Sequence, residues 1–140
     1  MPIVNFHLIE DQHTDEQLRT LLVEASALYA RVLESPIERV RVFINLRPPG
    51  LVAVAGVSVV DDGVCAPFFD CLVLAGRSLA QRHSLLAGFT DLLVNVLGAQ
   101  RASIRGVCRP VDPENWGIAG VPASVQRAAE IEARAAGTVD

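Results

Sequence analysis

The sequence predicts an α+β fold in which a β-α-β unit occurs twice, forming a four-stranded sheet with two helices on one face. Two amphipathic segments are predicted helices, apolar segments on either side are predicted strands, and the chain matches itself after a shift of 64 residues. A chain of 140 residues is long enough for one domain with its own core. We expect a single domain over 1–140, with units at 2–60 and 67–123 and a C-terminal helix or tail at 124–140.

The first unit opens with a predicted strand and helix. Residues Ile3 to Ile9 are apolar and include β-branched side chains, as is typical of a strand. Thr14 and Gln17 form a capping-box pattern, and apolar residues at helical spacing follow it. We therefore predict a helix from Asp15 to Leu33, which Ser35-Pro36 ends.

The rest of the first unit is predicted to be extended. Arginine and valine alternate at the start of Arg39 to Asn45, which predicts a second strand. After the turn residues Pro48-Pro49-Gly50, we expect Leu51 to Val60 to return as a short extended segment. Asp61-Asp62-Gly63 then interrupts the pattern.

The second unit repeats this order. Pro67 to Leu74 is a predicted strand, and a second capping-box pattern at Ser78 predicts a helix from Ser78 to Leu97. Ala102 to Cys108 is the next predicted strand, followed by a proline-bearing loop and a short return. The alanine- and charge-rich segment from Ser124 is predicted to be helical.

The repeat is supported by matches that amphipathic helices do not produce by chance. A shift of 64 residues aligns Arg41 with Arg105, Pro49 with Pro113, and Ala55-Gly56-Val57 with Ala119-Gly120-Val121. A shift of 65 residues aligns Pro2 with Pro67. Each unit is expected to join two parallel strands through a helical crossover. Because both helices would then cover one face, we expect the bare face to be buried in an oligomer.

Composition excludes several classes of partner. The net charge is −4 and no basic run occurs, so we expect no nucleic-acid partner, and no apolar run is long enough to span a membrane. No signal-peptide pattern is present, and three cysteines without metal-ligand spacing favour a reduced, cytoplasmic location. We expect no metal site, because the histidines are scattered (His7, His13 and His83). No cofactor is expected either.

Pro2 is the candidate catalytic residue. If Met1 is removed, as small second residues usually permit, the Pro2 nitrogen becomes a secondary amine. A free α-amino group titrates at about 7.7–8.0, close to the pH at which a general base is most useful. A retained Met1 would instead acylate this nitrogen and abolish its basicity.

The second unit carries motifs that resemble the tautomerase superfamily, typified by 4-oxalocrotonate tautomerase. These are Pro67, Gly76-Arg77-Ser78, Ser103-Ile104-Arg105 and Asn115-Trp116-Gly117-Ile118-Ala119-Gly120. The double-length chain is similar to the cis-3-chloroacrylic acid dehalogenase group, in which one chain equals two small subunits. The resemblance implies a tautomerase fold, like that of macrophage migration inhibitory factor, and a ring-shaped homotrimer.

The resemblance also implies roles for individual residues. Pro2 would be the general base or acid, Arg77 and Arg105 would bind substrate carboxylates, and Trp116 would line the pocket. Arg41 is a weaker candidate, because the first unit lacks the Gly-Arg-Ser and Trp-Gly motifs. The arginines could instead be solvated residues and Trp116 a packing anchor. Pro67 is internal and cannot be a base, which implies one working site per chain.

Departures from the dehalogenase pattern favour simple proton transfer. Tyr29 stands where those enzymes have a helical histidine, and Leu74 where they have a second arginine. Their water-activating carboxylate falls near Asn115 or Ile118, with only Glu114 adjacent. We expect a tautomerase acting on small 2-oxo or 2-hydroxy unsaturated carboxylic acids. The alternatives are a hydratase, dehalogenase or decarboxylase of 3-haloacrylate-type substrates, or a silent homologue that retains Met1.

Overall fold

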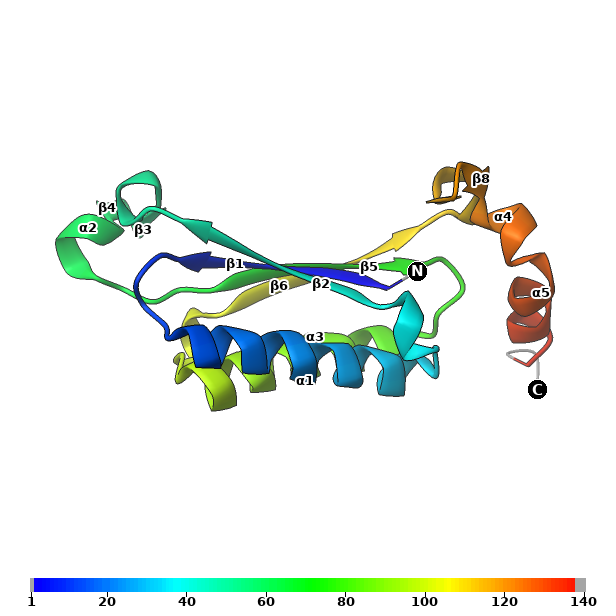
Figure 1. Cartoon of the computed structure of the whole chain (residues 1–140), viewed down its shortest axis with the longest axis horizontal. Coiled ribbons are helices and arrows are strands. Elements are labelled where there is room, and N and C mark those ends of the chain that lie inside the picture. The colour runs from blue at the N-terminus through cyan, green and yellow to red at the C-terminus, as the bar shows by residue number, and fades with distance from the viewer. Residues whose placement is uncertain (1, 138–140) are drawn as a thin grey trace.

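The computed structural model describes residues 2–137 and contains the expected four-stranded sheet (Figure 1). The strands are β1 (Ile3–Ile9), β2 (Arg41–Arg47), β5 (Phe68–Leu74) and β6 (Arg105–Val111), in the order β2-β1-β5-β6. Within each unit the strands are parallel, and the two units meet through the antiparallel pair β1 and β5. The predicted α+β fold with duplicated units is confirmed.

Two long helices lie side by side on one face of the sheet (Figure 1). They are α1 (Asp15–Leu33) and α3 (Leu79–Leu97). Both predicted capping boxes are present. The side chains of Thr14 and Ser78 accept hydrogen bonds from the backbone amides of Gln17 and Gln81, and each glutamine side chain accepts one from the backbone amide of its N-cap residue. These bonds satisfy amide groups that the first turn of a helix otherwise leaves unpaired.

The core between sheet and helices is built around a cluster of aromatic rings. Phe89 of α3 makes edge-to-face contacts with Phe6, Phe69 and Tyr29, whose ring centroids lie 5.7, 5.6 and 5.2 Å from its own. All four rings are fully buried. Gly106 of β6 lies directly over Phe69, where a Cβ atom would come within 2.1 Å of the ring. The two units therefore share one core.

Two predicted strands begin later than the sequence suggested. A 3₁₀ turn at Ile37–Arg39 delays β2 to Arg41, and a matching turn at Arg101–Ser103 delays β6 to Arg105. Each turn closes with its own backbone bond, so its residues are unavailable to the sheet. β6 consequently runs on to Val111, beyond the predicted end at Cys108.

The predicted extended return of each unit is instead a hairpin with a short helix. The first consists of a 3₁₀ turn (Pro49–Leu51), β3 (Ala53–Val54), β4 (Val57–Ser58) and α2 (Val59–Asp62). The second consists of a 3₁₀ turn (Pro113–Asn115), β7 (Gly117–Ile118), β8 (Val121–Pro122) and α4 (Ala123–Gln126). Both hairpins turn through an Ala-Gly pair with positive φ angles, 55° and 79° in the first and 51° and 81° in the second. Positive φ angles at two successive residues are typical of type I′ turns. The sequence repeat is therefore also a repeat of backbone conformation.

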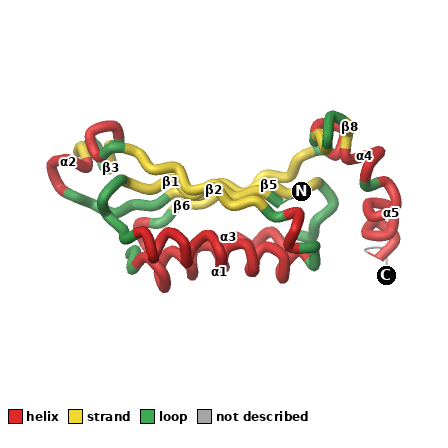
Figure 2. The backbone as a smooth tube through the Cα atoms, viewed as in Figure 1, coloured by secondary structure: helices red, strands yellow, loops and turns green. Residues whose placement is uncertain are grey.

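The C-terminal helix α5 (Ala128–Gly137) leaves the sheet beyond the second hairpin (Figure 2). Figure 1 shows it at the edge of the molecule nearest the start of β1. Within residues 2–137, no helix is long and apolar enough to cross a membrane. The predicted tail residues 138–140 lie outside the described part of the chain.

The sheet face opposite α1 and α3 is bare along its middle (Figure 1). Large apolar side chains are exposed on it, including Phe43 on β2 and Phe68 on β5. Polar side chains lie among them, because Asn5 donates to Asp70 at 3.0 Å and His7 Nε2 lies 2.7 Å from Asp70 Oδ2. An exposed face of this composition is typical of a surface that meets another protein chain.

Candidate active site

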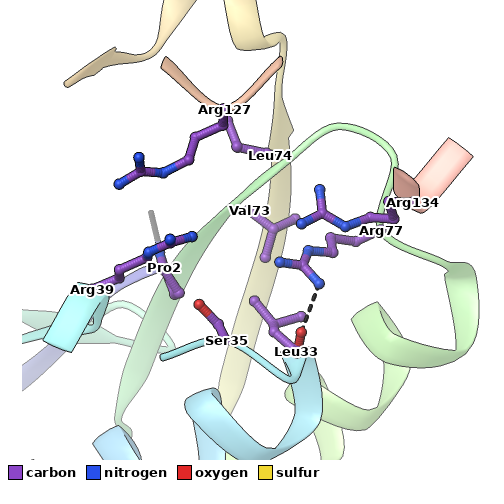
Figure 3. Close-up of a pocket in the computed structure, with 9 residues that line it drawn as sticks. All are labelled: Pro2, Leu33, Ser35, Arg39, Val73, Leu74, Arg77, Arg127 and Arg134. Carbon is purple, nitrogen blue, oxygen red and sulfur yellow. Dashed lines mark hydrogen bonds between the residues drawn. The ribbon is translucent and has the colours of Figure 1, made fainter. Parts of the chain in front are cut away.

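Pro2 lies at the start of β1, at the floor of a pocket formed where α1 ends (Figure 3). The residue is buried, and its carbonyl oxygen accepts a hydrogen bond from the Arg41 amide at 3.0 Å. Pro2 alternates with the buried side chains of Val4 and Phe6, which places it on the helix side of the sheet. Leu33 and Val73 add apolar surface beside it. The sequence therefore folds its candidate base into a mostly apolar corner.

Four arginines surround this corner, and they come from distant parts of the chain. Arg39 belongs to the 3₁₀ turn before β2, Arg77 precedes α3, Arg127 follows α4, and Arg134 lies on α5. Their guanidinium groups gather around Pro2 in Figure 3. Four fixed positive charges make the pocket a site for anions, and arginine is suited to bind carboxylates through two parallel hydrogen bonds.

Arg77 is held by the end of helix α1. Its Nη1 donates to the carbonyl oxygen of Leu33 at 2.7 Å, one of the carbonyls that a helix C-terminus leaves unpaired. Gly76 supports this geometry with a φ angle of 107°, which non-glycine residues rarely adopt. Burial, together with the like charge of Arg134, lowers the pKa of Arg77 to about 10, so the group stays charged at neutral pH. The Gly-Arg-Ser motif therefore has a local structural reason as well as a position in the pocket.

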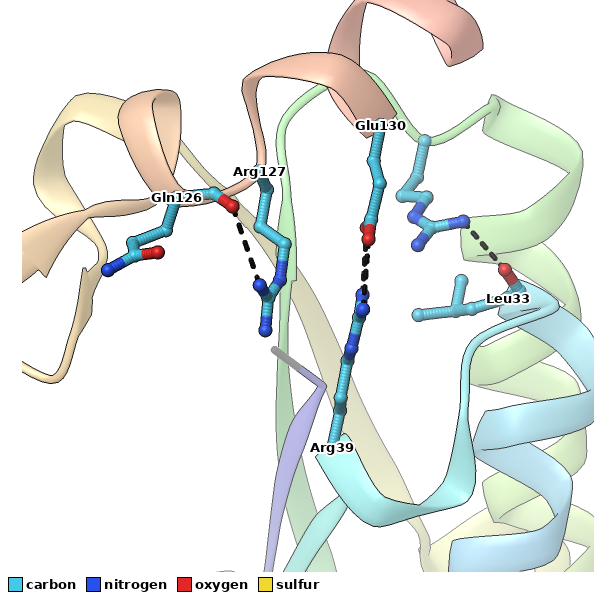
Figure 4. Close-up of polar contacts among 6 residues, drawn as sticks. Leu33, Arg39, Gln126, Arg127 and Glu130 are labelled. Atoms are coloured by element: carbon cyan, nitrogen blue, oxygen red, sulfur yellow. Dashed lines mark hydrogen bonds and ion pairs between the residues drawn. The ribbon is translucent and has the colours of Figure 1, made fainter.

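Arg39 already has a carboxylate partner (Figure 4). Its Nη1 and Nη2 donate to the two oxygens of Glu130, on α5, at 2.8 and 2.9 Å. The hydrogen bonds from Arg39 lower the pKa of Glu130, and the carboxylate in turn raises the pKa of Arg39. The pair fastens α5 against the turn that precedes β2.

Little free space remains between these side chains. The cavity has a volume of about 20 Å³, roughly what one water molecule requires. Arg127, just before α5, and Arg134, on α5, both line the pocket, so the C-terminal segment covers it from one side. A substrate of several carbon atoms needs some of these side chains to move.

Of the predicted site residues, only Pro2 and Arg77 line this pocket. Arg41 is exposed on the edge strand β2, where only its backbone contacts Pro2. Arg105 pairs with Phe68, five residues along β5 from Val73, so it begins its strand roughly 17 Å away. Its guanidinium donates to the carbonyls of the preceding turn, Ala102 and Ile104.

Trp116 and Tyr29 are buried beside the pocket and do not line it. Trp116 packs with Leu74 and Ala123 in a small cluster under the second hairpin. The Tyr29 hydroxyl donates to the carbonyls of Ile3 and Leu72, which face each other across β1 and β5. Burial raises the pKa of Tyr29, which keeps the hydroxyl protonated. Tyr29 thus supports the strand that carries Pro2 from behind.

The equivalent place in the other half of the chain lacks this charge. There Pro67 lies in a hollow with His13, the residue that aligns with Arg77 after a shift of 64. Burial lowers the pKa of His13, which favours its neutral form. The nitrogen of Pro67 is part of a peptide bond. The two halves of the fold therefore differ sharply in electrostatics at matching positions.

Arg39, Arg127 and Arg134 were not among the residues predicted from sequence. Arg127, Ile131 and Arg134 are half-buried, and their spacing of four and seven residues places them on one helical face. That spacing was the available signal, although it does not say what the face contacts. No such pattern marks Arg39. Among the described residues, no group of three or more His, Cys, Asp or Glu side chains is placed to hold a metal ion.

Comparison with known families gives a match that spans both repeats. The model of the family described as tautomerase enzyme matches residues 2–62 and again residues 67–126. Helix α5 lies beyond both matched segments.

Curated relatives are about half as long as this chain. The 2-hydroxymuconate tautomerase of Comamonas testosteroni is 42% identical over 57 residues, which are 41% of this chain and 90% of that protein. A 2-hydroxymuconate tautomerase of Pseudomonas putida is 39% identical over 57 residues, with the same coverage.

Solved structures of double-length chains share the whole fold. Native fused 4-OT is 25% identical and superimposes with a TM-score of 0.80, over 91% of this chain and 98% of that chain. Pt0534 inactivated by 2-oxo-3-pentynoate is 22% identical with a TM-score of 0.81, over 89% and 98% of the two chains. An asymmetric trimer of fused 4-OT has a TM-score of 0.79 at 23% identity, over 91% and 98%.

Proposed function

Because this chain belongs to the tautomerase family, we propose that it is a cofactor-independent tautomerase that uses Pro2 as its general base and acid. The substrate we propose is a small 2-oxo or 2-hydroxy unsaturated carboxylic acid. One observation carries the proposal: Pro2 lies at the floor of a pocket ringed by four arginines. The curated relatives named 2-hydroxymuconate tautomerase support the same class of substrate.

The first step requires a neutral amine at Pro2. Removal of Met1, whose state lies outside the described residues, frees this nitrogen. Neighbouring positive charges and burial both disfavour an ammonium ion, which supports a neutral amine at Pro2. The neutral nitrogen then takes the proton of the 2-hydroxyl group or of an adjacent carbon.

The second step returns the same proton at another position of the conjugated system. Loss of the first proton places one negative charge on the dienolate, next to the substrate carboxylate that is already negative. Arg77, half-buried and fixed by Leu33, stabilises this charge without reorganising. The protonated amine then delivers its proton to carbon, which completes the isomerisation and regenerates the base.

We also propose that the chain works as a homotrimer. The bare sheet face with exposed Phe43 and Phe68 supports this assembly, as do the fused 4-OT structures described as trimers. Arg41 and Arg105 are exposed on the edge strands, and neither side chain lines the pocket of its own chain. In the trimer they are the proposed carboxylate ligands of a neighbouring chain, and Trp116 supports the pocket wall through Leu74. Sedimentation at a mass of three 15.0 kDa chains tests the assembly.

The proposal is tested by intact mass combined with an ultraviolet assay on 2-hydroxymuconate and phenylenolpyruvate. We expect a mass without Met1, turnover of at least one substrate, and loss of turnover in Pro2→Ala. Treatment with 2-oxo-3-pentynoate provides an independent mark, because a neutral amine adds to its activated triple bond and transfers its proton to the product. Peptide mapping should locate the adduct on Pro2.

Other outcomes identify the alternatives. Release of halide or carbon dioxide without isomerisation would move the function to a dehalogenase or decarboxylase of the same family. A mass that retains Met1, no adduct and no turnover would leave a family member without its base.

A further inference from the structure

We propose that Arg39 is a further carboxylate-binding residue of the Pro2 pocket and that Glu130 occupies its binding position when no ligand is present. Under this inference, a substrate carboxylate replaces Glu130 on Arg39 and releases helix α5. It rests on the proposed function only in taking the ligand to be a small carboxylate.

The geometry of the pair is that of a bound ligand. The two terminal guanidinium nitrogens of Arg39 each donate to one carboxylate oxygen of Glu130, at 2.8 and 2.9 Å. This is the two-point arrangement in which arginine binds carboxylates. Within residues 2–137, Arg39 is the only one of the four pocket arginines that has an ion pair. Glu130 therefore presents to a pocket-lining arginine the same chemical group that the substrate would present.

Helix α5 is held loosely enough to be displaced. None of its residues is buried, and its half-buried positions are confined to one face. The Glu130 side chain is 45% exposed and the Arg39 side chain 27% exposed. Ion pairs with this much solvent contact contribute little net stability, so a competing carboxylate of similar geometry can replace one.

Displacement also answers a spatial problem in the pocket. The present cavity of about 20 Å³ accepts no substrate of several carbon atoms. Arg134 lies on α5, and Arg127 precedes it directly, so a movement of this helix widens the site from one side. Because the family match ends at residue 126, this cover is a feature of the C-terminal extension and not of the shared fold.

The deciding measurement is the affinity for (2E,4E)-hexadienedioate, an unreactive dicarboxylate, determined by calorimetry on mature protein. The variants are Glu130→Gln, Arg39→Gln and the double variant. Asp91→Asn is the matched control, because Asp91 forms an exposed ion pair with Arg101 at 2.7 Å, outside the pocket lining. Glu130→Gln removes the charge with almost no change of shape, whereas Arg39→Gln removes the charge and shortens the side chain.

The inference predicts the sign of each change. Glu130→Gln removes an internal competitor and should tighten binding roughly two- to fivefold. Arg39→Gln should weaken binding roughly tenfold or more, and in that background Glu130→Gln should give no further gain. Asp91→Asn should stay within about twofold of the wild type. Weaker binding by Glu130→Gln, or no binding by either wild type or Glu130→Gln, would overturn the inference.

Limited trypsin digestion gives a second readout that needs no activity. Trypsin can cleave after Arg127 and Arg134, before and within α5. Because hexadienedioate should release α5 from Arg39, cleavage at these two sites should become faster when it is added. Glu130→Gln should be cleaved at the faster rate without ligand. Protection by the ligand would instead mean that α5 closes over it, contrary to the inference. Neither measurement involves turnover, so a failure of Pro2 catalysis remains a separate result.

Discussion

Replacement of Arg77 separates a substrate-binding role from a structural one. Arg77 does two things at once: it carries a half-buried positive charge into the pocket and it donates to the terminal carbonyl of α1 at Leu33. Arg77→Gln removes the charge but keeps an amide donor on that side of the pocket, although its nitrogen lies two bonds nearer the backbone than Arg77 Nη1. Arg77→Ala removes both.

The expected magnitudes follow from these two contacts. A hydrogen bond to a charged group contributes about 1.5–3 kcal/mol, which corresponds to a roughly 10- to 150-fold loss of kcat/KM. Both variants should show this loss with 2-hydroxymuconate. The unpaired Leu33 carbonyl in Arg77→Ala should cost a further ~1 kcal/mol of folding free energy, or about 3–5 °C in Tm.

The assay pairs steady-state kinetics with thermal unfolding for each variant. Arg101→Gln is the control, because Arg101 is an exposed arginine whose ion pair with Asp91 lies outside the pocket lining. It should leave kcat/KM within about twofold. If Arg77→Gln keeps full activity while Arg77→Ala loses stability and activity together, Arg77 is a cap for α1 and the binding argument fails.

Three further predictions concern the scaffold that positions Pro2. Gly106→Ala should destabilise the fold by about 1–3 kcal/mol or more, because its Cβ would lie 2.1 Å from the packed Phe69 ring. Gly88→Ala should cost less, because its Cβ would meet only the end of the Leu28 side chain. Equal denaturant midpoints for the two variants would contradict this prediction. Tyr29→Phe should lower the unfolding free energy by ~1 kcal/mol and change kcat/KM by less than about threefold. The reason is that the Tyr29 hydroxyl donates to strand carbonyls and does not line the pocket. A larger loss of kcat/KM would refute this purely structural role. Burial alone would raise the pKa of Asp70, but its hydrogen bonds with His7 and Asn5 outweigh burial and lower the pKa below 3.8. The ionised carboxylate therefore stabilises the fold above pH 3.8, and this stabilisation is lost as the pH falls through the lowered pKa. Asp70→Asn removes this titration, so its Tm should fall less steeply at acid pH than that of the wild type.

The sequence was sufficient where local patterns determine structure. The capping boxes specified both long helices, and the matched Ala-Gly-Val blocks indicated the repeat, although the hairpin turns at these blocks were expected to be extended. It was insufficient where a short 3₁₀ turn formed in place of the start of a predicted strand. Arg39 alternated like a strand residue, but the 3₁₀ turn that contains it removed it from the sheet and aimed it at Pro2.

The candidate site could be predicted only in part, because its charge comes from segments that no local pattern connects. Pro2 and Arg77 belong to motifs, and the structure places them in one pocket. Arg127 and Arg134 lie in a tail whose sequence predicts a helix but not what that helix covers. Such docking depends on contacts between residues about 90 positions apart, such as Arg39 and Glu130. Arg105 shows the converse, since a motif residue begins its strand at the far end of the sheet from Pro2.

The antiparallel pairing of β1 with β5 has a further consequence, because the two strands belong to one continuous chain. Only residues 63–67 separate α2, the last element of the first unit, from β5, so the two units are joined by a short connection. Tethering through a short linker holds two partners at an effective concentration on the order of millimolar, whatever the total protein concentration. The same two units as separate polypeptides would follow mass action and part on dilution. In an assay at nanomolar enzyme, dilution acts only on contacts between chains, and the sheet that carries Pro2 stays assembled.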